Sequence, residues 1–146
     1  MALHTPLLSN LQGTERMYLP DAKMNKSNPE SCIFLYDSTK DIKRKIKRTY
    51  CVQKIIEGKH VIEIARYIVF LRFGRLEIER NEKFGGNLML NSSEKLEKVF
   101  AEDKLYPADL KATLSNALMK ILESVKEYYN KNGENLKKLM KIKVML

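Results

Sequence analysis

The clearest hydrophobic pattern in the chain lies in its last third. Apolar residues recur there at the spacing of one helix face: Leu110, Leu114, Ala117, Leu118, Ile121, Leu122 and Val125. Pro107 precedes this pattern and suits the first position of a helix, where its missing N–H costs nothing. Asn132-Gly133 follows the pattern and suits a helix end. The spacing therefore predicts one long helix between these signals, and a further short helix from Glu134 to Leu146.

An earlier helix is predicted to begin at Ser38. Ser38 is a favourable N-cap, and Asp41 stands three residues on, as in a capping box. Ile42, Ile46 and Tyr50 then recur every four residues, which predicts one apolar face. The other positions are almost entirely basic: Lys40, Lys43, Arg44, Lys45, Lys47 and Arg48. Such residues can be plain solvated surface, but as a cluster they favour contact with a phosphate backbone.

The middle of the chain predicts a second helix, a hairpin and a third helix. The segment from Val61 to Phe73 carries a broad apolar stripe, and Gly74 suits its C-cap. Residues 76–80 and 87–90 then alternate apolar and polar positions on either side of a Gly-Gly turn, which is typical of a β-hairpin. Ser92 or Ser93 caps a short helix after it. The pattern as a whole predicts a mainly α fold with one small hairpin.

The stretch before Ser38 has no such periodicity. Asn10, Gly13, Pro20 and Pro29 interrupt it, which predicts a long loop from about residue 9 to residue 30. Long loops of this kind are usually functional or disordered. Cys32–Tyr36, just before the first helix, is a short β-prone run.

Composition narrows the class of protein. The chain has 146 residues, and 27 Lys and Arg against 18 Asp and Glu give a net charge of +9, which favours an anionic partner such as nucleic acid. The two cysteines form no CxxC pair, which indicates a reduced, cytoplasmic protein without a metal site. No signal peptide is recognisable, and no apolar run reaches the roughly 18 residues that a membrane span needs.

The loop carries the most distinctive local motif, Lys23-Met24-Asn25-Lys26-Ser27. Two lysines three residues apart in a segment with no regular structure can close over a polyphosphate. Taken alone, such lysines are more often ordinary surface.

This motif resembles the KMSKS signature of class I aminoacyl-tRNA synthetases. Further blocks occur in the family's order, namely HTPLLSNLQGTERM, KMNKSNPESCIF, YDS, EKFGG and YPADL. Together they resemble the C-terminal half of an archaeal or eukaryotic-type tyrosyl-tRNA synthetase, from about Leu3 to about Lys126. The resemblance implies a helical anticodon-binding domain at 38–130. A KMSKS-like loop and remnant of the catalytic domain would precede it at 1–37, and a basic helical extension would follow at 131–146.

The resemblance also implies roles for the loop residues. Lys23 and Lys26 would be catalytic and, with Ser27, would contact ATP, the magnesium-bound substrate of the complete enzyme. Cations that reach the departing pyrophosphate mainly in the transition state raise the rate of amino-acid activation. Asn25 stands where the family usually has serine, and we expect this change to be tolerated.

A second set of roles concerns tRNA. Phe84 and Tyr106 correspond to rings that stack on the first anticodon base, and Asp109 corresponds to an acid that hydrogen-bonds to this guanine. Each has a plainer explanation, since the Phe84 ring could fold back onto the core and Asp109 could simply favour the helix dipole. For the tRNA backbone we select four residues of the basic helix: Lys43, Arg44, Lys47 and Arg48.

The sequence contains no HIGH motif and no tyrosine pocket. We therefore expect this chain to be inactive alone, to need an N-terminal catalytic half in cis or in trans, and to be a monomer without it. The alternative is a free-standing, non-catalytic tRNA- or RNA-binding module. A tryptophanyl-tRNA synthetase is a second rival, against which the EKFGG and YPADL blocks argue by resemblance.

Overall fold

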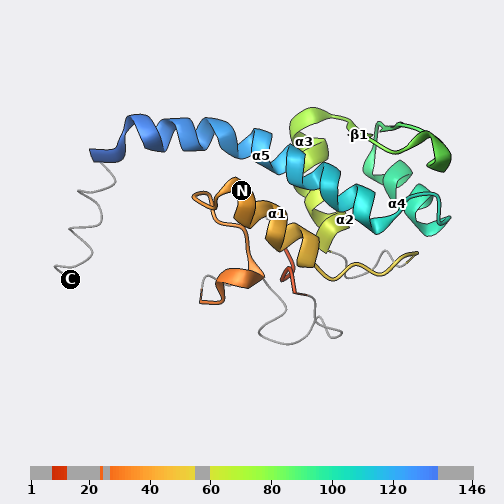
Figure 1. The fold of residues 1–146 in the computed structure, drawn as a ribbon, viewed down its shortest axis with the longest axis horizontal. Helices are drawn as coiled ribbons and strands as arrows, with labels where there is room; N and C mark the ends of the chain where they lie inside the picture. Colours follow the sequence, from red (N-terminus) through yellow and green to blue (C-terminus); the bar gives the residue numbers. More distant parts are fainter. Residues whose placement is uncertain (1–7, 13–23, 25–26, 55–59, 135–146) are drawn as a thin grey trace, which may run out of the picture.

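The fold is a set of helices with a two-stranded hairpin at one end (Figure 1). The computed structural model describes residues 8–12, 24, 27–54 and 60–134. Its elements are η2 (Pro29–Ser31), α1 (Thr39–Arg48), α2 (His60–Ile64), the π-helical turn η3 (Ala65–Val69), α3 (Phe70–Phe73), β1 (Leu76–Ile78), η4 (Glu82–Phe84), β2 (Leu88–Leu90), α4 (Ser93–Ala101) and α5 (Pro107–Lys131). The predicted mainly α fold with a hairpin is confirmed.

Helix α5 lies across the whole molecule, with α1 packed along it and its C-terminal end projecting beyond the other helices (Figure 1). Pro107 is its first residue and Asn132 its C-cap, as predicted. Leu110, Leu114, Leu118 and Leu122 are buried and form the predicted stripe. This stripe joins α1, α2 and the hairpin in one hydrophobic core.

Helix α1 begins at the predicted cap, where the Ser38 hydroxyl accepts a hydrogen bond from the Asp41 N–H at 3.1 Å. Ile42 and Ile46 are completely buried against the core. The prediction was wrong for Tyr50, because the helix ends at Arg48 and the Tyr50 side chain is half exposed.

Lys45 does not belong to the basic surface of α1. It lies next to Ile46 on the inner side of the helix and is buried. Its ammonium group lies 2.7 Å from Asp37 Oδ2 and 4.9 Å from the centre of the Phe34 ring. A buried lysine needs such a partner, because an unpaired charge in the interior costs several kcal/mol. This pair ties α1 to the segment before it.

The predicted helix from Val61 to Phe73 is confirmed as the continuous run α2, η3 and α3, which Gly74 ends with a φ of +70°. The predicted hairpin is also confirmed, since β1 and β2 pair antiparallel with Leu76 opposite Leu90. Its connection is longer than a tight Gly-Gly turn, because the chain makes the turn η4 before it reaches Gly85 and Gly86.

The expected β-prone run at Cys32–Tyr36 is not a strand. The Phe34 N–H donates to Asp37 Oδ2 at 2.9 Å, and the Asp37 N–H donates to the Phe34 carbonyl at 3.1 Å. These bonds close a turn. No strand within the described part of the chain lies beside this run, so its β-prone side chains have no ladder to join.

Ser9 and Leu11, near the beginning of the described chain, are bonded to the rest of the fold. Both Ser9 groups, its N–H and its hydroxyl, donate to the Glu63 carboxylate of α2 at 2.7–3.0 Å. The Leu11 N–H donates to the Ser31 carbonyl at 3.0 Å, and the Leu11 side chain is buried in the core. The stem of the predicted loop is therefore part of the same core. The predicted helix beyond Glu134 and most of the 3–8 segment lie outside the described residues.

The buried pair of Asp37 and Lys45 gives a stability prediction. Asp37→Ala leaves the Lys45 ammonium buried without its acceptor, so we expect the free energy of unfolding to fall by about 3 kcal/mol. Urea denaturation followed by circular dichroism measures it. Lys43→Met on the exposed side of α1 is the matched control, and we expect it to change stability by less than about 0.5 kcal/mol. Equal effects of the two substitutions would contradict this account.

Candidate nucleic-acid interface

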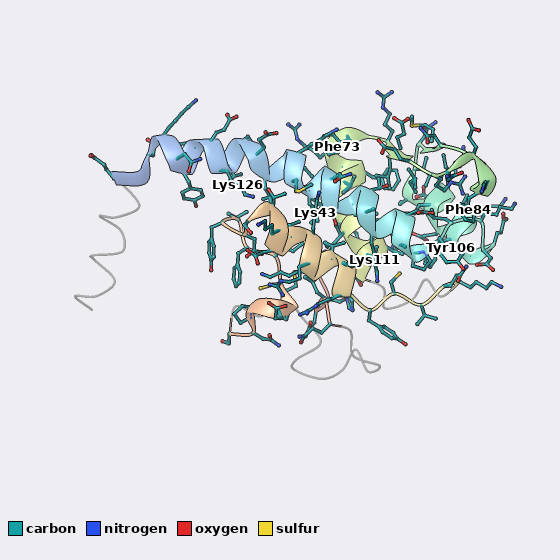
Figure 2. The ribbon with its side chains drawn as sticks, in the orientation of Figure 1. Lys43, Phe73, Phe84, Tyr106, Lys111 and Lys126 are labelled. Carbon is teal, nitrogen blue, oxygen red and sulfur yellow. The ribbon has the colours of Figure 1, made fainter. Side chains whose placement is uncertain are left out.

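One pocket brings together the three residues predicted to read an anticodon base. It has a volume of about 770 Å³ and lies between the hairpin connection and the turn that joins α4 to α5. Phe84, Tyr106 and Asp109 all line it. The remaining lining residues are Arg80, Leu88, Val99, Asp103 and Lys104. Figure 2 shows Phe84 and Tyr106 at the same end of the molecule, on different elements.

The hairpin connection presents Phe84 outward. The Asn81 side-chain oxygen accepts from the Lys83 N–H at 3.0 Å and caps η4, the turn that ends at Phe84. Gly85 follows with a φ of +90°, a backbone conformation that side chains rarely adopt and that reverses the chain here. The Phe84 ring is 67% exposed, so it does not fold back onto the core.

The start of α5 supplies the other two residues. Tyr106 is the N-cap residue of this helix, has an extended backbone and is 59% exposed. Asp109 lies in the first turn, where a carboxylate favours the helix dipole. Among the described residues, its carboxylate has no hydrogen-bond or ion-pair partner. Asp109 is therefore an unengaged acceptor on the pocket wall.

The neighbouring carboxylate of Asp103 is engaged. The Lys54 ammonium lies 3.0 Å from its Oδ2, and the Gln53 amide donates to its Oδ1. Both of these contacts come from the segment after α1. Of the two acids that line the pocket, Asp109 is thus the one whose oxygens have no protein donor within the described part of the chain.

A second pocket adjoins the first, because Tyr106 lines both. It has a volume of about 790 Å³ and lies between α1 and the first turns of α5. Its wall carries three lysines, Lys43, Lys47 and Lys111, and no acidic residue. The Lys111 ammonium also donates to the Lys47 carbonyl at 3.3 Å. The sequence did not identify Lys111 as a candidate, because its position beside α1 depends on how the two helices pack together.

The other two basic residues selected on α1 differ from each other. Arg48 is exposed and, among the described side chains, forms no ion pair, although its charge is one of those that lower the pKa of the Glu30 carboxyl. Arg44 forms ion pairs with Glu30 and Asp41, and the hydrogen bond from its guanidinium lowers the pKa of the Glu30 carboxyl below its usual value. The positive charge of Arg44 is therefore largely compensated within the chain.

Of the KMSKS-like residues, Lys23, Asn25 and Lys26 lie outside the described residues. Ser27 is exposed and lines a hollow of about 690 Å³ with Glu30, Phe34, Asp37 and others. Lys45 and Arg44 of α1 form part of the same wall. The end of the motif thus lies directly beside α1.

No group of three or more His, Cys, Asp or Glu side chains in the described ranges is arranged to hold a metal ion. None of the helices described here is both long enough and apolar enough to cross a bilayer.

The sequence and the fold match one family of proteins. The model of the class I tRNA synthetases for tryptophan and tyrosine matches residues 2–123. The tyrosine–tRNA ligase of Saccharolobus solfataricus is 38% identical over 152 aligned positions, covering 97% of this chain and 42% of the relative. That of Aeropyrum pernix is 40% identical, covering 86% of this chain and 37% of the relative. The chain thus spans about two fifths of the length of these curated relatives.

Solved structures agree with the sequence matches. The crystal structure of tyrosyl-tRNA synthetase from Aeropyrum pernix superposes with a TM-score of 0.79 at 35% identity, over 96% of this chain and 38% of that chain. The enzyme from Pyrococcus horikoshii, complexed with L-tyrosine, has the same TM-score at 31% identity, over 90% of this chain and 38% of that chain. The chain therefore belongs to the class I tRNA synthetases of the tryptophan and tyrosine type, and the relatives described here are tyrosyl-tRNA synthetases.

Proposed function

We propose that this chain is the C-terminal part of a tyrosine–tRNA ligase, which recognises the tRNA anticodon and carries the ATP-contacting loop. Residues 38–130 form the anticodon-binding domain in this proposal, residues 1–37 belong with the catalytic domain and residues 131–146 are a basic extension. The observation that supports it best is the pocket that Phe84, Tyr106 and Asp109 line together. These residues were selected from two separate motifs, and the fold brings the motifs to one place.

The chemistry of this pocket suits an unpaired guanine. Two exposed rings on different elements can stack on a base, and such stacking contributes about 1–3 kcal/mol per base. The Asp109 carboxylate can accept hydrogen bonds from the N1–H and the amino group of guanine. Adenine and the pyrimidines lack this pair of adjacent donors, so Asp109 would supply the discrimination. Anticodon bases are splayed out in single-stranded loops and can be read in this way.

The adjoining pocket suits the phosphates on either side of that base. Lys43, Lys47 and Lys111 line it without any acidic residue, and it reaches the Tyr106 ring. Arg48 extends the same charge along α1. Contacts of this kind fix the position of an RNA without reading its sequence. Arg44 would contribute least to phosphate binding, because it is already paired with Glu30 and Asp41.

The loop would act in the first half of the reaction. In the activation of tyrosine, charge accumulates on the β- and γ-phosphates of the magnesium-bound ATP as pyrophosphate leaves. Lys23 and Lys26 would stabilise that charge in the transition state, and Ser27 would donate a hydrogen bond to the phosphates. The tyrosine pocket and the HIGH motif would come from an N-terminal catalytic half, in cis or in trans.

A non-catalytic RNA-binding module is the second candidate. It is favoured by the fact that both pockets lie entirely on residues 43–116 and include no part of the loop. The two candidates predict the same RNA binding and differ in whether the loop residues Lys23, Lys26 and Ser27 take part in catalysis.

Base recognition can be tested with short RNA hairpins that differ in the first anticodon base. We expect Phe84→Ala to weaken binding of the guanine hairpin by about 1–3 kcal/mol, because one stacking face is lost. Asp109→Asn should reduce the preference for guanine over adenine. Fluorescence anisotropy gives both dissociation constants. Tyr128→Ala, an exposed ring far along α5, is the control and should bind as the parent does. Undiminished binding and preference in both pocket variants would refute the guanine-reading site.

Phosphate contacts can be tested by the salt dependence of tRNA binding. Each of Lys43→Gln, Lys47→Gln and Lys111→Gln should reduce the slope of log K against log salt by about 1, because one released counterion is lost. Arg44→Gln, on the same helix as Lys43 and Lys47, is the matched comparison and should change this slope less, since its charge is already offset. The preference for guanine should stay constant in all four variants. An unchanged slope in the three lysine variants would show that RNA does not follow this groove.

The role of the loop can be tested by adding an N-terminal catalytic half and measuring tyrosine-dependent ATP–pyrophosphate exchange. We expect exchange only in the mixture, and a decrease of at least about tenfold with Lys26→Ala, because transition-state stabilisation is lost. Lys40→Ala, on the exposed side of α1, is the control. Exchange by this chain alone would contradict the division of labour, and an unaffected Lys26→Ala mixture would favour the non-catalytic module. A charging assay with tyrosine and tryptophan identifies the amino acid.

A further inference from the structure

Arg80 is a pocket residue to which the sequence assigns no role. It follows β1, and its guanidinium makes two hydrogen bonds to main-chain carbonyl groups. Its Nε donates to the Gly86 carbonyl at 3.0 Å, and its Nη1 donates to the Lys104 carbonyl at 2.7 Å. The main-chain N–H of Arg80 donates to the Asn87 side-chain oxygen at 3.3 Å, across the base of the hairpin connection.

These two carbonyl groups belong to the two segments that form the pocket. Gly86 lies two residues after Phe84, and Lys104 lies two residues before Tyr106. Among the described residues, no other hydrogen bond or ion pair joins residues 79–87 to residues 102–109. One side chain therefore connects the segment that carries one ring to the segment that carries the other.

The chemistry of arginine suits this connection. A guanidinium is always charged, and its planar fork holds several donors in a fixed relative geometry. Hydrogen bonds from a charged donor are about twice as strong as neutral ones. A lysine in the same place carries its three donors on one freely rotating nitrogen, so it fixes the relative position of two separate carbonyl groups less well.

On the proposed function, we propose that Arg80 is a positioning residue for base recognition, which sets the separation of the Phe84 and Tyr106 rings. A base between two rings gains full stacking only when the gap matches its thickness, and Asp109 then meets the edge of that base. Loss of Arg80 leaves both rings and the carboxylate present, but on segments that are no longer joined. The affinity for guanine and the preference over adenine should then fall together.

The test uses the full chain and the same guanine and adenine hairpins. We expect Arg80→Met, which keeps the length of the side chain, to lower the guanine-to-adenine preference roughly tenfold, as for the loss of two charge-assisted bonds. Arg80→Lys should give an intermediate loss. The salt slope should decrease by less than in the lysine variants, because the guanidinium is bonded to the protein. Arg75→Met, an exposed arginine just before β1, is the control and should keep the parental preference.

The outcomes separate the two proposals. If Phe84→Ala loses the preference and Arg80→Met, folded by circular dichroism, keeps it, the positioning role is wrong and the proposed function stands. If the parent chain itself does not prefer guanine, both are overturned. Should Arg80→Met fail to fold, Arg80→Lys decides, since a preference equal to that of the parent overturns the positioning role and a partial loss supports it.

Discussion

The packing of α5 against α1 is the contact on which the rest of this structure depends. The leucine stripe of α5 and the two isoleucines of α1 bury each other's apolar surface, and the hairpin, α2 and α4 complete the same core. This packing fixes where the first turn of α5 begins. It thereby places Tyr106 and Asp109 at one end of the helix pair and aligns Lys111 with the lysines of α1. The candidate interface is thus a consequence of how two helices share one core.

Helix α1 has two different surfaces. Its inner side holds the preceding segment through the buried pair of Lys45 and Asp37, and the ion pair of Arg44 with Glu30 lies at its edge. Its outer side presents Lys43 and Lys47 to the groove shared with α5. On the proposed function, one short helix therefore contacts both the RNA and the stem of the ATP-contacting loop. Any tilt of α1 on RNA binding would change the hollow that Ser27, at the end of that loop, lines together with α1.

Local signals explain which parts of the fold could be predicted. The Ser38 cap, Pro107, Gly74 and the spacing of the leucines each act over a few residues, so the helices they define are where the pattern put them. The interpretation of Cys32–Tyr36 as β-prone was wrong, because a strand requires a second strand to pair with. The sequence does not show whether such a strand lies beside this run. Lys45 was misplaced among the surface lysines because its partner Asp37 lies outside the helix, eight residues earlier.

The candidate site also combines features that local sequence shows with features that depend on the tertiary structure. Phe84, Tyr106 and Asp109 were selected by resemblance to family motifs, and their common pocket required the tertiary structure. Lys111 and Arg80 belong to none of these motifs. Their proposed roles depend on contacts between segments far apart in the chain, which single-residue patterns do not contain.

The pocket that Phe84, Tyr106 and Asp109 line comes from one short part of the chain. Every residue that lines it lies between Arg80 and Asp109, on one uninterrupted stretch that contains η4, β2, α4 and the first turn of α5. Lys43 and Lys47 of α1, to which the proposed function assigns phosphate contacts, lie outside this stretch, and so does the KMSKS-like loop. On the proposed function, exchanging this one stretch would change the preference for the anticodon base and would leave the α1 lysines and the loop residues in place.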